Sequence, residues 1–316
     1  MMMVLSIVAI LLAILVGYLA QRTGLCMVRG VHELIARRPA FLLAILCCGF
    51  WYWLIVPFTG KEWVPFLSTR FDGTFHFLLG GLLFGLGAAL NKGCSISTIS
   101  KLASGHFYML ATIFGWIAGW LLLPTLTPPI SYQPLDAIHT PILPILIPLL
   151  LMLFITVIQT STERRMLMFG VMFFGITASL LSLIEPQWSP SQLLKDISYS
   201  FYHHNSENWP ALDRYFIITG LVAGMAIGSK SRLPLSDFQF RVKQLLAHLF
   251  AGTIMGLGAS LALGGNDSQL LIALPAFSPS GAVAILFIII GIATGLAIRK
   301  VYKRITHKEK HKTTPE

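Results

Sequence analysis

Long apolar stretches recur along the chain, and they constrain its fold more than any other feature. About nine of them are long enough to cross roughly 30 Å of hydrocarbon as helices. They occupy residues 2–20, 40–58, 75–91, 107–124, 142–159, 166–184, 213–229, 244–263 and 281–299. Only 11% of the residues are charged and 55% are hydrophobic, so water cannot be the main solvent of the fold. The sequence therefore predicts an all-α integral membrane protein with about nine transmembrane helices.

The basic residues predict how these helices are oriented. With the N-terminus outside, all but four of the 23 Lys and Arg residues fall in cytoplasmic segments, the exceptions being Lys61, Arg70, Lys195 and Arg214. Residues 1–298 are then a single transmembrane domain, and residues 299–316 are a basic, solvated cytoplasmic tail. The first apolar stretch lacks a basic flank and a cleavage site, so we expect a membrane helix there and not a removable leader. The predicted location is the cell inner membrane, with several passes, the N-terminus outside and the C-terminus cytoplasmic.

One glycine-rich segment occurs twice. Residues 80–97 read GGLLFGLGAALNKGCSIS and residues 251–268 read AGTIMGLGASLALGGNDS, in register at a constant offset of 171 residues. By the predicted helix order the two copies cross the bilayer in opposite directions, which indicates an inverted pseudo-twofold repeat. The first repeat covers about residues 1–124, linking helices cover about 125–212, and the second repeat covers about 213–298.

The glycines and the breaks that follow them carry different information. Gly81 and Gly85, like Gly252 and Gly256, are four residues apart, and a small-residue helix interface alone explains such a stripe. It does not explain the polar breaks that follow, at residues 93–95 and 264–266, each leading into a short helix-compatible stretch at 96–102 or 269–274. Irregular backbone at membrane depth is tolerated where it lines a polar cavity, so the paired breaks predict a substrate site near the midplane with short interrupted or re-entrant helices.

Two further segments stand out from the apolar pattern. Residues 17–30 (GYLAQRTGLCMVRG) are too polar to span and too apolar for an ordinary loop, so we expect them to dip back toward the core. Their counterpart in the second half, residues 224–230, has no cysteine. Residues 185–210 mix aromatic and polar side chains and are expected to form an amphipathic interfacial segment on the outer side.

The four cysteines are too few for a disulfide framework in a chain of this size and are expected to be reduced. Cys26 and Cys94 follow predicted breaks and are the candidate pathway thiols, whereas Cys47 and Cys48 lie mid-helix and suit packing. For each candidate, a purely structural role is the alternative. Cys94 could fill a tight turn beside glycine, and Cys26 could be a buried hydrophobe.

A thiol is a soft, weak hydrogen-bond donor, which suits a soft anion that must bind and then leave. We expect Cys26 and Cys94 to offer successive weak contacts, while backbone N–H groups at helix starts near Ile96 and Gln269 stabilise negative charge. Asn266 would supply a polar contact that Gly265 cannot. The predicted pathway residues are Cys26, Cys94, Gly93, Ser95, Gly264, Gly265 and Asn266, with Arg22, Arg29 and Lys92 holding an anion at the cytoplasmic mouth.

Together these segments resemble the YeeE/YedE family of sulfur-compound membrane transporters, whose best-known members take up thiosulfate. The resemblance lies in residues 17–30, in 80–95, in DFQFR at 237–241, in 252–266 and in LPAFS at 274–278. It implies a nine-helix pseudo-twofold fold with a narrow path lined by cysteine thiols, of which Cys26 and Cys94 correspond to two. Where the family commonly has a third cysteine, this chain has Gly265. The resemblance also implies a soluble cytoplasmic sulfur-carrier protein as a downstream partner.

The predicted function is therefore a permease for a small sulfur-containing anion such as thiosulfate, or a related sulfur or selenium species, in contact with membrane lipids. Two alternatives are a membrane thiol–disulfide carrier using Cys26 and Cys94, and a structural subunit of a sulfur-trafficking complex. An enzyme is not expected, because no G-x-S-x-G elbow occurs and His106 and His248 have no evident serine partner. The sequence predicts no cofactor, metal or nucleic acid: metal-ligand clusters and a nucleotide-binding motif are missing, and membrane topology explains the net charge of +10.

Overall fold

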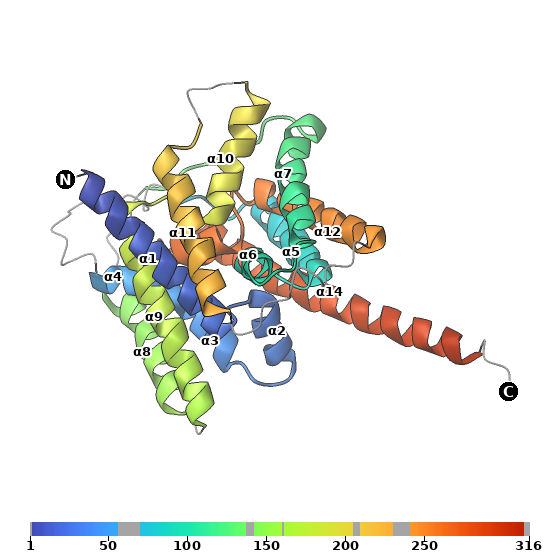
Figure 1. Ribbon diagram of the computed structural model, residues 1–316, viewed down its shortest axis with the longest axis horizontal. Helices are drawn as coiled ribbons and strands as arrows, with labels where there is room; N and C mark the ends of the chain where they lie inside the picture. The colour runs from blue at the N-terminus through green and yellow to red at the C-terminus, as the bar shows by residue number, and fades with distance from the viewer. Residues whose placement is uncertain are drawn as a thin grey trace.

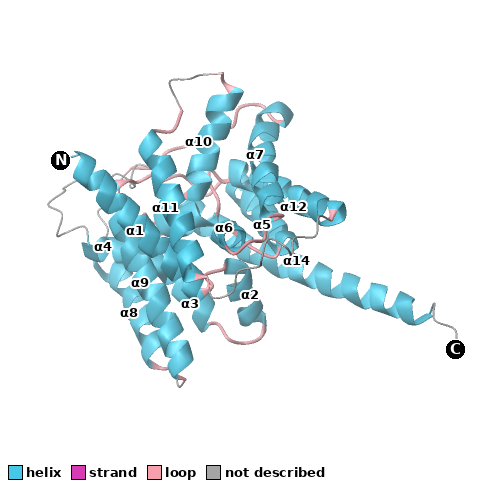
Figure 2. Cartoon of the chain, in the orientation of Figure 1, coloured by secondary structure: helices cyan, strands magenta, loops and turns pink. Residues whose placement is uncertain are grey.

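The chain is almost entirely helical in its computed structural model, which describes residues 2–55, 70–136, 142–159, 161–204, 209–229 and 241–312 (Figures 1 and 2). Within these ranges there is no strand, only an isolated bridge between Phe71 and Pro134. The helices are α1 (Met2–Thr23), α2 (Met27–Ile35), α3 (Ala40–Cys47), η1 (Cys48–Phe50), α4 (Trp51–Ile55), α5 (Phe75–Asn91), α6 (Ser95–Ala103), α7 (Met109–Leu126), α8 (Ile142–Val157), α9 (Thr162–Ile184), α10 (Pro190–Tyr202), α11 (Leu212–Gly228), α12 (Val242–Leu261), α13 (Asn266–Ser268), the π-helical turn η6 (Gln269–Ala273) and α14 (Pro279–Lys312). Within the described residues, each predicted apolar range is mostly helical; residues 56–58 of the range 40–58 lie outside the described residues.

Several of these helices have the length and composition to cross a membrane. Among the described residues there are six such stretches: Leu5–Ile35, Phe75–Ala103, Met109–Leu126, Thr162–Ile184, Val242–Leu261 and Pro279–Tyr302. Large apolar side chains lie exposed on their outer faces and on α8; Leu11 is 60% exposed, Phe114 64% and Phe154 61%. Apolar exposure on this scale fits a lipid-facing surface, so the chain is a multi-pass membrane protein. The count of nine membrane helices stays a prediction.

The glycine stripes bring helix backbones into direct contact. Gly81 and Gly85 of α5 lie against the backbone of α14, and Gly252 and Gly256 of α12 lie against the backbone of α7. A Cβ atom at any of the four would overlap a carbonyl oxygen of the facing helix. The predicted small-residue packing is therefore present in both copies, and each glycine-rich helix lies against a different partner helix.

Both glycine-rich helices also end in the same way. In α5 the N–H of Gly93 donates to the Ala88 carbonyl at 2.9 Å, and in α12 the N–H of Gly264 donates to the Ala259 carbonyl at 2.8 Å. The residues just before these glycines, Lys92 and Leu263, are left-handed at φ 60° and φ 57°. This Schellman-type end stops each helix abruptly, and the chain then starts a short helix, α6 or α13 with η6.

One expectation about the linker needs correction. Residues 185–210 do not form a purely interfacial segment, because Trp188 is buried at 1% exposure and the start of α10 packs inside the molecule beside α13. Only the far end of α10 is open to the surroundings, with Phe201 at 60% exposed.

The basic tail from residue 299 continues a membrane-length helix. The α14 helix runs without a break from Pro279 to Lys312 and projects away from the body (Figure 1). The cytoplasmic location of this tail stays a prediction.

Candidate functional site

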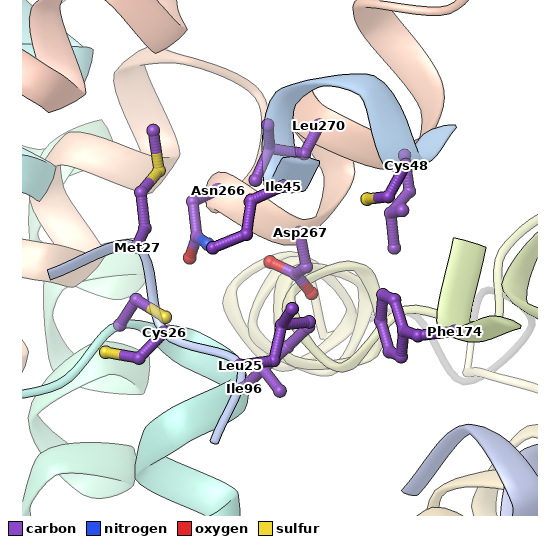
Figure 3. A pocket seen from close by; sticks show the side chains of 12 residues that line it. Leu25, Cys26, Met27, Ile45, Cys48, Ile96, Phe174, Asn266, Asp267 and Leu270 are labelled. Carbon is purple, nitrogen blue, oxygen red and sulfur yellow. The ribbon is translucent and has the colours of Figure 1, made fainter. Parts of the chain in front are cut away.

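Three backbone breaks meet around one narrow pocket in the interior. The breaks lie between α1 and α2, between α5 and α6, and between α12 and α13. The space between the lining side chains is about 10 Å³, roughly what one water molecule needs. The lining residues are Leu25, Cys26, Met27, Ile45, Cys48, Cys94, Ile96, Phe174, Asn266, Asp267, Leu270 and Leu271 (Figure 3). The structure therefore brings the two predicted pathway thiols and Asn266 together, and the pocket that they line is narrow.

The two thiols occupy the same kind of position on two different helices. Cys26 is the N-cap residue of α2 and Cys94 is the N-cap residue of α6, each with extended backbone. The Ser97 hydroxyl lies between the two sulfur atoms: the Cys26 thiol donates to it at 3.3 Å, and it lies 3.6 Å from Cys94 Sγ. All three groups are weak or adaptable hydrogen-bond partners, so the arrangement can be remade around a ligand.

Another part of the pocket lining comes from the second glycine-rich copy. Asn266 is 2% exposed, and its side-chain oxygen accepts two hydrogen bonds from Ser95, from the hydroxyl at 2.7 Å and from the backbone N–H at 3.3 Å. Asn266 and Ser95 are equivalent residues of the two copies, because they are 171 positions apart. The side-chain amide group of Asn266 thus joins the start of α13 to the start of α6.

Helix starts point positive potential at the pocket. The first N–H groups of a helix have no partner within it, and the helix dipole adds partial positive charge there. The N-cap residues of α2 and α6 are the pocket thiols themselves, and neither thiol makes a capping hydrogen bond to its own helix, although Asn266 Oδ1 accepts from the Ser95 N–H at the start of α6. These starts therefore favour an anion beside Cys26 and Cys94.

Asp267 is a pocket residue that the sequence analysis missed. It is 0% exposed, and its Oδ2 accepts a hydrogen bond at 3.0 Å from the backbone N–H of Ser191, in the first turn of α10. Its Oδ1 is buried and has no hydrogen-bond partner. The sequence did contain a usable signal. An ionisable side chain near the membrane midplane costs free energy, so an acidic residue in a predicted midplane break is a functional candidate.

The missing third thiol has a steric explanation. Gly265 is the N-cap residue of α13, with φ −79° and ψ −175°, a conformation open to any residue. A Cβ atom there would lie 2.8 Å from Asp267 Oδ1 and 3.0 Å from both Ser191 Cβ and Trp116 Cζ2. The space for a side chain is therefore taken by α10, α7 and Asp267.

Gly93 and Gly264 make room for hydroxyl groups in an equivalent way. A Cβ atom on Gly93 would lie 2.7 Å from Ser97 Oγ, and one on Gly264 would lie 2.8 Å from Ser268 Oγ. Ser97 contacts the pocket thiols, whereas Ser268 contacts Ser191 at 2.5 Å. In both copies a serine hydroxyl thus packs against a glycine, but the hydroxyl contacts different neighbours in each copy.

The basic residues predicted near the thiols do not line the pocket. Arg22 is exposed, with its guanidinium 5.9 Å from the ring centre of Tyr18. Arg29 is paired with Glu33 at 2.9 Å on the surface of α2. Lys92 is exposed, and its carbonyl oxygen accepts a hydrogen bond at 2.6 Å from Lys101 Nζ.

Lys101 is a second residue that the sequence analysis did not select. A Cβ atom on Gly93 would lie 3.4 Å from its Nζ, so this ammonium group is close to the break that carries Cys94. The α6 helix joins Lys101 to the pocket, since its first residue, Ser95, follows the thiol directly.

A second cavity lies on the other side of α13 and η6. It measures about 140 Å³, and its lining includes Ser268, Gln269, Gln192 and Lys195. Asn266, Asp267, Leu270 and Leu271 of the same short segment line the thiol pocket instead. This short segment therefore separates the thiol pocket from a mixed polar and apolar cavity that contains one lysine. Within the described residues, no group of three or more His, Cys, Asp or Glu side chains could hold a metal ion.

Comparison with known proteins gives a family. A family model described as sulphur transport matches the chain in two regions, residues 22–165 and 139–294. These regions include the glycine-rich helices, the three breaks and every residue of the pocket. No curated protein matches the chain.

Proposed function

This chain belongs to the YeeE/YedE sulfur transport family, and we propose that it is a permease for a small sulfur-containing anion, thiosulfate or a closely related sulfur or selenium species. The observation that carries the proposal is the pair of pocket thiols, Cys26 and Cys94, held beside one serine hydroxyl at the starts of two helices. A permease moves its substrate unchanged, so the proposal assigns no catalytic residue.

The contacts suit a soft anion that must also leave. The sulfur atom of a thiol is polarizable and its S–H is a weak donor, so desolvating it costs less than desolvating an ammonium group. The anion would contact the Cys26 and Cys94 thiols one after the other. The Ser97 hydroxyl would donate a hydrogen bond to it between these two contacts. Conduction needs binding that is favourable but shallow, and two thiols with two helix starts meet that requirement better than a buried arginine.

The inverted repeat is part of the proposal, and reciprocal contacts support it. The equivalent residues Ser95 and Asn266 hydrogen-bond to each other at 2.7 Å, as expected for groups beside a twofold axis. The α1–α11 contact is reciprocal too: a Cβ on Gly17 would meet the Leu221 carbonyl, and a Cβ on Gly224 would meet the Ile14 carbonyl. Such an axis in the membrane plane gives two oppositely oriented halves with the pocket near the midplane.

The orientation of the pathway follows from the charge distribution. With nine membrane helices, the N-terminus outside and the C-terminus in the cytoplasm of the inner membrane, Lys195 lies toward the outside and Lys92, Lys101, Arg22 and Arg29 lie toward the inside. The anion would enter by the cavity beside Lys195, pass the thiols and leave beside Lys101. A soluble cytoplasmic carrier would then accept the sulfur species.

Uptake by purified protein in liposomes tests the proposal. Radiolabelled thiosulfate should enter vesicles containing the wild-type chain, and Cys26→Ala and Cys94→Ala should each reduce the initial rate at least about tenfold, because a lost transition-state contact of about 1.4 kcal/mol has that effect. Cys47→Ala is the matched control, since Cys47 is a buried free cysteine like Cys94 but does not line the pocket. Undiminished uptake in both pocket variants would contradict the role of the thiols. A panel of sulfur and selenium anions in the same vesicles identifies the substrate.

The thiol–disulfide carrier remains the second candidate, because the Ser97 hydroxyl brings both sulfur atoms to one place. A carrier must form a Cys26–Cys94 disulfide during its cycle, whereas a permease keeps both thiols reduced. Alkylation before and after mild oxidation, read as a shift in gel mobility, separates the two. Transport that continues with both thiols reduced excludes the carrier.

A further inference from the structure

The buried carboxyl group in the pocket is difficult to reconcile with simple passage of an anion. Asp267 and the two thiols line the same small space, so an anion between Cys26 and Asn266 lies beside the carboxyl group. Figure 3 shows the carboxyl oxygens directed into the middle of the pocket, with Cys26 and Asn266 to one side and Phe174 to the other. Two like charges in a buried space with room for about one water molecule repel strongly, and one of them is neutralised by a proton.

The surroundings of Asp267 contain no compensating cation. Among the described residues that line the pocket there is no Lys, Arg or His, and the titratable neighbours are the thiols of Cys26, Cys48 and Cys94. The elements packed on α13 add few charges. On α10, Lys195 faces the other cavity and Asp196 is paired with Arg214 at 2.7 Å. On α6, the one charged residue is Lys101, whose Nζ is bonded to the Lys92 carbonyl.

The hydrogen bonding of Asp267 is compatible with either protonation state. With the pocket free of anion, the Ser191 N–H and the start of α10 stabilise the carboxylate through Oδ2. The other oxygen, Oδ1, is buried and has no partner. A proton on Oδ1 converts it from an acceptor into a donor, and this donor can bond an anion in the pocket while Oδ2 keeps its bond to Ser191.

We infer that Asp267 is a proton-binding residue, and that each sulfur anion crosses together with one proton. This inference rests on the permease function proposed above. The proton binds Oδ1 when the anion enters from the outside and leaves Oδ1 when the anion departs to the cytoplasm. No covalent bond to sulfur forms and no electron moves. For a divalent anion, one negative charge crosses in each cycle.

Accumulation driven by a pH gradient tests the inference. Proteoliposomes are prepared with the inside one pH unit above the outside, and the membrane potential is held at zero with valinomycin and equal potassium. At one proton per anion, the wild-type protein should accumulate thiosulfate about tenfold, because the concentration ratio of the anion balances that of the proton. Asp267→Asn keeps the size and an acceptor for Ser191 but cannot carry a proton, and it should abolish this accumulation. Asp72→Asn, at an exposed aspartate that does not line the pocket, is the control and should accumulate like the wild type.

A second measurement, proton uptake by wild-type vesicles, tests the coupling even if Asp267→Asn folds poorly. Adding thiosulfate to wild-type vesicles without a gradient should make the weakly buffered outer solution more alkaline, by one proton for each anion taken up. If wild-type uptake does not depend on the pH gradient and leaves the outer pH unchanged, the proton coupling is wrong and the permease function still stands. Proton uptake that persists in folded Asp267→Asn also overturns the assignment. Wild-type vesicles that take up no sulfur anion overturn the permease function itself.

Discussion

Gly265→Ala is expected to destabilise the protein, although alanine is the smallest side chain that could be added. The backbone at Gly265 is extended, so its conformation costs alanine nothing. The cost comes from space, since the new Cβ would lie 2.8 Å from Asp267 Oδ1 and 3.0 Å from Ser191 Cβ and Trp116 Cζ2. Carbon atoms pack best at about 3.5–4.0 Å, so each neighbour would have to move by several tenths of an ångström or more.

None of these neighbours moves easily. Asp267 is held by the Ser191 N–H, and Trp116 is 1% exposed and packed edge-on against Phe84 with ring centres 5.7 Å apart. Overpacking a rigid site costs about 1–3 kcal/mol. Replacing glycine also restricts the unfolded chain, which stabilises by about 0.4–1 kcal/mol. The steric term is larger, so the net loss should be about 0.5–2 kcal/mol.

Reversible unfolding in mixed detergent micelles measures this loss. Gly73→Ala is the matched control: Gly73 is also outside a helix, but its new Cβ would meet only a Val283 methyl group at 3.0 Å, with the next atoms at 3.5 Å and beyond, and a change within about 0.5 kcal/mol is expected. In the double variant with Asp267→Ala the nearest contact is gone, so the effects should be non-additive by at least about 0.5 kcal/mol. Equal stability of Gly265→Ala and Gly73→Ala, or strict additivity, would refute the steric explanation for the missing thiol.

Two further substitutions test the contacts between the halves. Asn266→Ala removes the acceptor for both the Ser95 N–H and its hydroxyl, and leaving these buried donors unpaired should cost about 1–3 kcal/mol, read as a lower unfolding midpoint in the same micelles. Gly224→Ala places a Cβ on the Ile14 carbonyl of α1 and should lower the melting temperature clearly, whereas Gly220→Ala, one turn earlier, finds its nearest atoms at 3.2–3.4 Å and should change it little. Equal melting temperatures for the two glycine variants would contradict close α1–α11 packing.

The helices and their breaks could be predicted from sequence because their causes are local. An apolar run must be helical in lipid, and the glycine-rich range 75–91 matches α5 at both ends because the Asn91-Lys92-Gly93 sequence stops the helix there. The doubled motif then indicated where a second break would lie. These signals depend on residues within about one or two turns of each other.

The composition of the pocket could not be predicted in the same way. Ser191 meets Asp267 from 76 positions away, and nothing local to residues 185–210 indicates that the start of α10 packs inside the molecule. Nearness in sequence was also misleading for Arg29. It lies three residues after Cys26, but the turn of α2 carries its side chain to Glu33, four residues on, and over the ring of Phe41. Lys101 lies about two helical turns after Cys94, and its side chain reaches back to the Lys92 carbonyl and to Gly93 at the start of α6.

The differences between the two copies indicate how the pocket could select its ligand. Where the first copy has Cys94 and Ile96, the second has Gly265 and Asp267, and the acid together with Ser191 and Trp116 occupies the room that a thiol at 265 would need. The pocket therefore offers soft sulfur donors from the first copy, and an amide and a carboxyl group from the second copy. Thiosulfate has one terminal sulfur atom and three oxygen atoms, so it can contact both kinds of group at once. An anion with oxygen atoms alone satisfies only the amide and carboxyl groups, and leaves the thiols with the weaker of their possible partners. On this reasoning the loss of the third thiol does not remove selectivity for sulfur, but moves part of the binding to Asn266 and to the protonated form of Asp267.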